Sequence, residues 1–247
     1  STLMSIEKGR KREDKAQKIF TLSFVIGLFL SFIYTVIGFV FLDEIATILG
    51  ATKAVLPLVK EYMIVVVVGT LPFLMGSILA PFIRADKAPK TAMAAVIISG
   101  FTNIALDYIF VFPLNMGMKG IALSTLVSEI FYFGFSTIFL IKKKLWFKRS
   151  HKNFAESKEI LISIVKIGFV QFLMQSLNSV SAFIINKVLI FYGSLSYVGA
   201  WSICSNMNMV ILLPLIGLTQ GVQSIVAYFH SSQNKSKERR VKNKVLQ

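Results

Sequence analysis

The sequence predicts an all-α integral membrane protein, folded as a polytopic helical bundle. Hydrophobic residues make up 55% of the 247 residues and charged residues only 16%, whereas charged residues are about a quarter of an ordinary soluble domain. The mean hydropathy is +0.69. Six apolar segments reach the roughly 20 residues that a helix needs to cross the hydrocarbon core. The sequence lacks the strand-length alternation of an outer-membrane barrel, so these spans are predicted as helices.

The predicted spans follow one another along the whole chain. They cover residues 19–42, 57–83, 91–112, 119–141, 160–192 and 197–229. The last two are longer than a simple span, which predicts tilt, a kink or an extension beyond the bilayer. Every second connection is a short loop, near Asp43, Pro113 and Gly193.

The lysines and arginines gather in the other connections. All but five of the 27 precede the first span, lie between the second and third, follow the fourth or follow the sixth. By the positive-inside rule these segments, with both ends of the chain, are expected in the cytoplasm. The formal net charge of +15 then reflects topology. A nucleic-acid footprint would not alternate with spans, so the lipid bilayer, and not nucleic acid, is the expected partner.

The sequence has no motif of an enzyme or of a cofactor site. Its single cysteine, Cys204, cannot form a disulfide within these residues, and two histidines far apart do not make a metal cluster. No Gly-rich phosphate loop, nucleophile elbow or zinc-binding helix motif occurs. We therefore expect neither catalysis nor a bound cofactor.

One carboxylate interrupts the third predicted span, where Asp107 is the only charged residue between positions 91 and 112. An acid within a membrane usually faces a bundle interior or a wet cavity. Asn103 lies one turn away on the same face, and the 1.5 Å rise per residue puts Thr125 of the next span at a similar depth. These three side chains are predicted to bind a hard cation such as Na+, or a proton on the carboxylate. The alternative is that Asp107 is solvated near the outer interface.

A second acid lies in the fourth predicted span, where Glu129 follows Thr125 by one turn. We group Glu129 with the predicted cation-coupling residues. Its predicted role is to relay protons or to contact a cationic substrate. Alternatively, it pairs with a polar group of a neighbouring helix.

Three uncharged polar residues form a stripe on the fifth predicted span. Gln171, Gln175 and Asn178 recur at spacings of four and three. Such a stripe suits the wall of a substrate cavity, and it equally suits hydrogen bonds between helices.

A basic segment occurs twice, since residues 9–20 resemble residues 234–245. Six predicted spans separate the copies, and an even number gives both the same orientation. This favours parallel halves related by an axis along the membrane normal, as in some transporters. The chain is then expected to begin late in one half and to stop early in the other.

Motifs along the chain resemble the multidrug and toxic compound extrusion (MATE) family. They are FLDEIATILGAT from Phe41, IRADKAPK from Ile83, NIALDYIF from Asn103, MGMKGIALSTLVSE from Met116 and KIGFVQFLMQSLNSV from Lys166. The resemblance implies a two-lobe fold of twelve helices, of which this chain resembles helices 3 to 8. Residues 1–141 would end the N-terminal lobe, residues 142–159 would form a basic cytoplasmic linker, and residues 160–247 would hold helices 7 and 8 and the beginning of helix 9.

The resemblance also implies a function. Family members export amphipathic, often cationic compounds by antiport with Na+ or H+, which implies a monomeric exporter in the cytoplasmic membrane. Related members bind the coupling cation through Asn-x-x-x-Asp on helix 5 and a threonine on helix 6, which match Asn103, Asp107 and Thr125. Their aspartate on helix 1 has no counterpart in this sequence, and Asn178 stands where some members carry a carboxylate on helix 7. The alternative is a flippase for lipid-linked oligosaccharides or polysaccharides, which shares the two-lobe plan.

Overall fold

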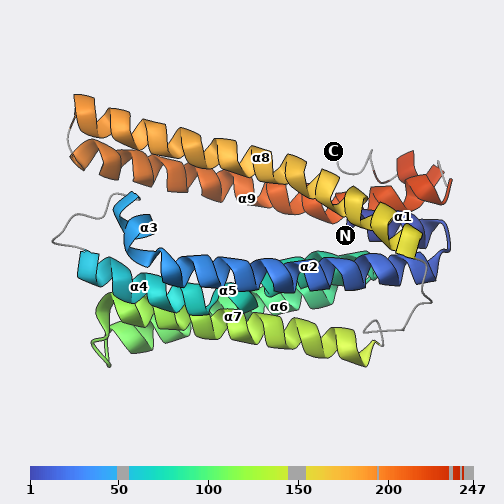
Figure 1. Ribbon diagram of the computed structural model, residues 1–247, viewed down its shortest axis with the longest axis horizontal. Coiled ribbons are helices and arrows are strands. Elements are labelled where there is room, and N and C mark those ends of the chain that lie inside the picture. Colours follow the sequence, from blue (N-terminus) through green and yellow to red (C-terminus); the bar gives the residue numbers. More distant parts are fainter. Residues whose placement is uncertain (49–55, 144–153, 194, 234–235, 240, 242–247) are drawn as a thin grey trace. The chain divides into compact units, whose positions relative to one another are not determined.

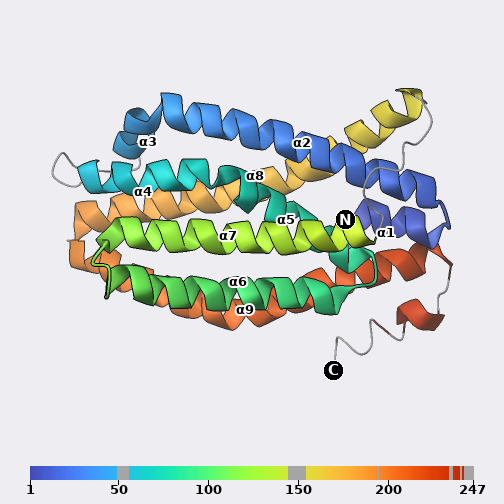
Figure 2. The same ribbon diagram turned by 90° about the horizontal axis from the view of Figure 1, so that it is seen from below.

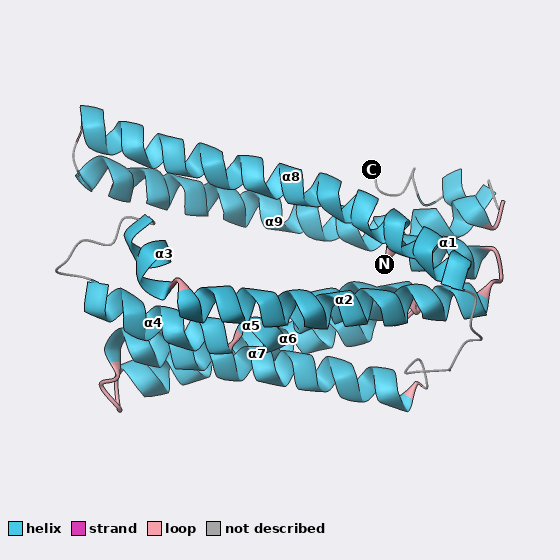
Figure 3. Cartoon of the chain, viewed as in Figure 1, coloured by secondary structure: helices cyan, strands magenta, loops and turns pink. Residues whose placement is uncertain are grey.

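The chain folds into helices, as its apolar segments predict. The computed structural model describes residues 1–48, 56–143, 154–193, 195–233, 236–239 and 241, and these contain no strand (Figures 1 and 3). Residues 1–150 and residues 151–247 form two compact units. The boundary lies within the predicted linker 142–159, of which residues 144–153 are outside the described residues. The expected beginning of a further helix, at residues 244–247, is also outside them.

The described residues form nine helices. Their bounds are α1 Thr2–Gly9, α2 Glu13–Val40, α3 Leu42–Ile48, α4 Leu56–Val68, α5 Thr70–Ala85, α6 Pro89–Val111, α7 Gly117–Lys142, α8 Phe154–Tyr192 and α9 Leu195–Ser231. Five of them, α2, α6, α7, α8 and α9, are each long and apolar enough to cross a membrane, and α4 with α5 makes a sixth candidate. These match the six predicted spans and confirm the fold class. α8 and α9, of 39 and 37 residues, exceed a simple span as expected.

The second predicted span is not one straight helix. α4 ends at Val68, α5 begins at Thr70, and the two are bent by 50°. Pro72 in the first turn of α5 explains the break, because proline has no N–H for the carbonyl four residues earlier and its ring crowds that carbonyl. The predicted span over residues 57–83 is therefore present as a broken helix, interrupted at Gly69.

Two short helices occupy segments that the sequence predicts as connections. Asp43, expected in a loop, lies in the first turn of α3 and accepts a hydrogen bond from Lys60 Nζ at 2.7 Å. α1 packs against α2 and α5. Its buried Lys8 forms an ion pair with Asp86 in the turn after α5. Helices this short carry little periodic signal and are held by tertiary contacts, which is why the sequence did not reveal them.

Within residues 1–150, α6 and α7 form an antiparallel hairpin (Figure 2). Asn115 and Gly117 in its turn have φ of +50° and +55°, and glycine adopts this left-handed backbone without steric cost. α7 also packs against α4 and α5, and α2 packs against α5. Small residues allow these helices to approach closely, since a Cβ at Gly76 would lie 2.6 Å from Tyr132 Cδ1.

The connections within residues 1–150 alternate between two ends of the bundle. The basic α1–α2 and α5–α6 connections lie at one end, and the α6–α7 turn lies at the other (Figures 1 and 2). This alternation is what the distribution of lysine and arginine predicts.

Within residues 151–247, α8 and α9 pack against each other. The apolar stretches of both helices are exposed, with none of their residues buried. So much exposed apolar surface on a helix pair suits contact with lipid or with other transmembrane helices.

Candidate functional site

The α6–α7 hairpin brings together the residues that the sequence predicts for cation coupling. Asn103 and Asp107 lie one turn apart on α6, and both are partly buried. Asn103 Nδ2 donates a hydrogen bond to Thr125 Oγ1 on α7 at 3.4 Å. The structure thus places Asn103 and Thr125 at the same depth in the hairpin.

Asp107 is held by a residue that the sequence analysis missed. Ser124, which precedes Thr125 on α7, donates a hydrogen bond from Oγ to Asp107 Oδ1. Its side chain is completely buried, at 0% exposure. A signal for it was present, because Gly120, Ser124 and Ser128 are small residues spaced by four, the pattern of a close helix–helix contact.

A third contact continues the same row. Ser99 on α6 donates a hydrogen bond from Oγ to the backbone carbonyl of Ser128 on α7, at 3.0 Å. Three rungs, Ser99–Ser128, Asn103–Thr125 and Asp107–Ser124, therefore cross the α6–α7 interface at successive turns, and we name them the polar ladder. Hydrogen bonds between helices satisfy polar side chains that have no water to bind within the membrane.

The polar ladder leaves oxygen atoms for a cation. The Asn103 amide donates through nitrogen, so its oxygen remains available, as does Asp107 Oδ2. Thr125 Oγ1 accepts from Asn103 with one lone pair and keeps the other. A carboxylate, an amide oxygen and a hydroxyl are ligands suited to a hard cation such as Na+.

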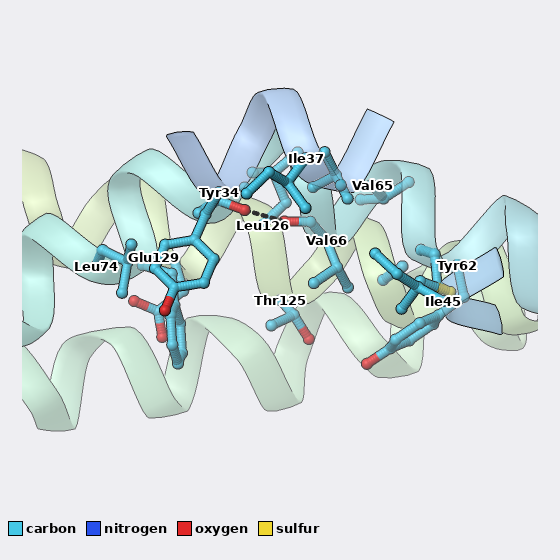
Figure 4. A pocket seen from close by; sticks show the side chains of 17 residues that line it. Tyr34, Ile37, Ile45, Tyr62, Val65, Val66, Leu74, Thr125, Leu126 and Glu129 are labelled. Carbon is cyan, nitrogen blue, oxygen red and sulfur yellow. Dashed lines mark hydrogen bonds between the residues drawn. The ribbon is translucent and has the colours of Figure 1, made fainter. Parts of the chain in front are cut away.

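Glu129 lines a pocket of about 570 Å³ on the neighbouring face of α7. The pocket lies among α2, α3, α4, α5 and α7 (Figure 4). Its lining residues are Tyr34, Ile37, Gly38, Ile45, Tyr62, Met63, Val65, Val66, Val67, Gly69, Thr70, Phe73, Leu74, Ala122, Thr125, Leu126 and Glu129. Glu129 is the only charged side chain among them. The pocket therefore combines an apolar and aromatic wall with one negative charge.

The pocket environment bears on the alternatives for Glu129. In the part of the chain that the structure describes, its carboxylate forms no hydrogen bond and no ion pair. Pairing with a polar group of a neighbouring helix is thus not found among these residues. Figure 4 draws Tyr34 near Glu129 at one end of the pocket and Tyr62 toward the other end.

The break between α4 and α5 forms part of the pocket wall. Val66, Gly69 and Thr70 all line the pocket. Thr70 Oγ1 donates a hydrogen bond to the Val66 carbonyl at 3.3 Å, beside the interruption of the helix. Broken helices in transporters often border binding sites, because they place backbone polar groups where a ligand lies.

The polar stripe of the fifth predicted span lies on α8. Gln171, Gln175 and Asn178 are exposed, and among the described residues their side chains make no hydrogen bond to α9. Their assignment to a substrate cavity remains a prediction.

Comparisons with known proteins agree with this architecture. Residues 1–109 match the MatE family model. The multidrug export protein MepA of Staphylococcus aureus is 30% identical over 238 residues, which are 96% of this chain and 52% of MepA. MepA of Staphylococcus saprophyticus is 29% identical over 227 residues, 92% of this chain and 50% of that protein. The chain thus spans about half the length of the curated relatives it matches.

Solved structures show the same fold. A crystal structure of a MATE protein in the bent conformation has a TM-score of 0.83 at 23% identity, covering 99% of this chain and 55% of that chain. An outward-facing multidrug resistance MATE transporter of the MOP superfamily has a TM-score of 0.86 at 22% identity, covering 97% and 53%. MATE proteins are membrane transporters and not enzymes, and the motifs, the family match and the fold together show that this chain belongs to the MATE family.

Proposed function

We propose that the protein exports amphipathic, cationic compounds across the cytoplasmic membrane in exchange for Na+ or H+. Both ends of this chain would lie in the cytoplasm, and the transporter would work as a monomer. The relatives named as multidrug export proteins support the export of drugs, and the basic connections support the orientation.

One observation carries the proposal: Thr125 belongs both to the polar ladder and to the wall of the Glu129 pocket. A cation bound by Asp107, Asn103 and Thr125 would pull on the Thr125 hydroxyl. The two sites share Thr125, so a shift of its side chain on cation binding would also change the wall of the pocket. Binding at one site would then alter affinity at the other.

The pocket suits the proposed substrate class. An organic cation would place its charge by Glu129 and its apolar body against Phe73 and the valines of α4. Tyr34 and Tyr62 offer ring faces, which attract cations. Gln171, Gln175 and Asn178 on α8 are proposed to offer uncharged hydrogen-bonding groups to a substrate.

Antiport follows when cation and drug favour different conformations. Cation binding at Asp107, Asn103 and Thr125 would favour one arrangement of the lobes and drug binding the other, each by its differential affinity. Rocking of the lobes would then expose the pocket to either side of the membrane.

The proposal is tested by ethidium efflux from energised cells that express the full-length protein, with and without a sodium gradient. Asp107→Asn is expected to abolish cation-driven efflux at equal expression, because the amide retains the shape and loses the charge. Asp43→Asn is the matched control, since Asp43 pairs with Lys60 away from the polar ladder. Unchanged efflux in Asp107→Asn would place coupling elsewhere, and no efflux from the intact protein would contradict drug export.

A further inference from the structure

Ser124 has one proton and two acceptors. Its Oγ contacts Asp107 Oδ1 across the helix interface and also lies 2.8 Å from the backbone carbonyl of Ile121 on its own helix. A hydroxyl donates only one hydrogen bond, so the two acceptors compete for it. Buried serines on helices commonly donate to such a backbone carbonyl, so that bond is the local default for Ser124.

When Asp107 is ionised, the Ser124 hydroxyl donates to its carboxylate and not to the Ile121 carbonyl. Hydrogen bonds to a carboxylate are roughly twice as strong as those between neutral groups. In the described part of the chain, the Asp107 carboxylate has no hydrogen-bond partner other than Ser124. The fixed position of Oδ1 therefore depends on this single hydroxyl, which the complete burial of Ser124 shields from water.

The neighbouring rung of the polar ladder lies beside this contact. Ser124 and Thr125 are consecutive on α7, and they contact Asp107 and Asn103, which are consecutive turns of α6. Fixing Oδ1 leaves Oδ2 as the carboxylate oxygen free to meet a cation. Without the Ser124 hydroxyl the carboxylate would rotate between several orientations, and only a fraction of them would present an oxygen beside Asn103 and Thr125.

We propose that Ser124 is a positioning residue of the cation site, which holds the Asp107 carboxylate in the orientation that binds the coupling cation. This inference rests on the proposed function, because it requires that Asp107 bind the coupling cation. Ser124 itself does not contact the cation. Its removal should weaken cation binding and leave drug binding unchanged, since it is not among the residues that line the pocket.

The test is a graded series at one position in the full-length protein. Ser124→Cys keeps the shape and a weak donor, and Ser124→Ala removes the donor. Ethidium efflux from proteoliposomes is measured against Na+ at constant pH or, where efflux ignores Na+, against the external proton concentration. We expect Ser124→Ala to raise the half-saturating cation concentration about tenfold, as loss of a charge-assisted hydrogen bond predicts, with Ser124→Cys in between. The maximal rate and the half-saturating ethidium concentration should stay as in the wild type.

Ser128→Ala is the matched control. Ser128 is also buried on α7, but its hydroxyl donates to the backbone carbonyl of Thr125 at 2.8 Å and not to Asp107. Equal shifts in Ser128→Ala and Ser124→Ala would mean general loss of packing and would overturn the proposal. If Ser124→Ala fails to accumulate, wild-type cation response in Ser124→Cys overturns it.

Asp107→Asn separates this inference from the proposed function. If cation dependence is lost in Asp107→Asn and unchanged in Ser124→Ala, the coupling site stands and the positioning role of Ser124 is wrong. If Asp107→Asn keeps its cation dependence, the coupling site itself is wrong, and Ser124 has no ligand to position.

Discussion

Asn103 Nδ2 on α6 donates a hydrogen bond to Thr125 Oγ1 on α7 at 3.4 Å, and Thr125 also lines the pocket that contains Glu129. A single hydroxyl thus lies between the candidate cation site and the candidate substrate site. This relationship predicts that a change at Thr125 affects both ligands, whereas changes at residues of only one site affect one.

Thr125→Val replaces the hydroxyl with a methyl group of similar shape. We expect the half-saturating concentrations of cation and of ethidium both to rise, the first about tenfold, because a ligand and a hydrogen-bond acceptor are lost. Thr125→Ser keeps the hydroxyl and should stay close to the wild type in both. Efflux titrations in proteoliposomes measure the two constants. An effect confined to the cation would contradict the shared role of Thr125.

Glu129→Gln removes the only charge among the described residues that line the pocket and keeps the shape of the side chain. The half-saturating concentration of monovalent cationic dyes should rise about tenfold, as expected for loss of one desolvated charge contact. Export of an uncharged substrate should not change, because the apolar wall remains. Glu61→Gln is the control, since Glu61 is exposed on α4 and is not among the lining residues. Equal loss for charged and neutral substrates would show that Glu129 acts through pocket structure.

The sequence predicts much of this architecture because hydropathy and helical spacing are local properties. The six spans follow from hydropathy along the chain. The rise per residue predicts Asp107 and Thr125 at a similar depth, and the structure pairs Thr125 with Asn103, one turn away from Asp107, while Asp107 pairs with Ser124. The contact of Ser124 with Asp107 was not predicted, because it depends on how two helices pack and because serine is a common small residue in membrane helices. The break between Val68 and Thr70 was not predicted, although Gly69 and Pro72 are helix-breaking residues, because membrane helices tolerate both residues without ending.

The break between α4 and α5 offers a test of how backbone geometry shapes the pocket. Pro72→Ala restores an N–H that can donate to the Val68 carbonyl, so the helix should straighten. Because Val66, Gly69 and Thr70 line the pocket beside this break, the half-saturating ethidium concentration should rise severalfold.

Pro81→Ala is the matched control for Pro72→Ala. Pro81 lies inside α5, away from the pocket-lining residues. It should leave ethidium affinity unchanged in the same efflux assay. Similar losses in both variants would mean that general helix geometry, and not the break at Gly69, controls substrate binding.

The ion pair between Lys8 and Asp86 joins α1 to the turn after α5, and its side chains are only 8% and 15% exposed. Asp86→Asn leaves the buried ammonium without its charge partner. Breaking a buried pair in this way is expected to lower the free energy of unfolding by about 3 kcal/mol. Thermal unfolding of the purified full-length protein in detergent would show this as a lower midpoint.

Arg10→Gln supplies the comparison, because Arg10 pairs with Glu7 while its own side chain is 52% exposed. An exposed pair contributes less than about 1 kcal/mol, so its loss should barely move the unfolding midpoint. The double change Lys8→Met with Asp86→Leu removes both charges together and should recover most of the stability lost in Asp86→Asn, since no charge is left buried alone. If Asp86→Asn is as stable as Arg10→Gln, packing of α1 against α2 and α5 holds α1 in place, and the ion pair adds little.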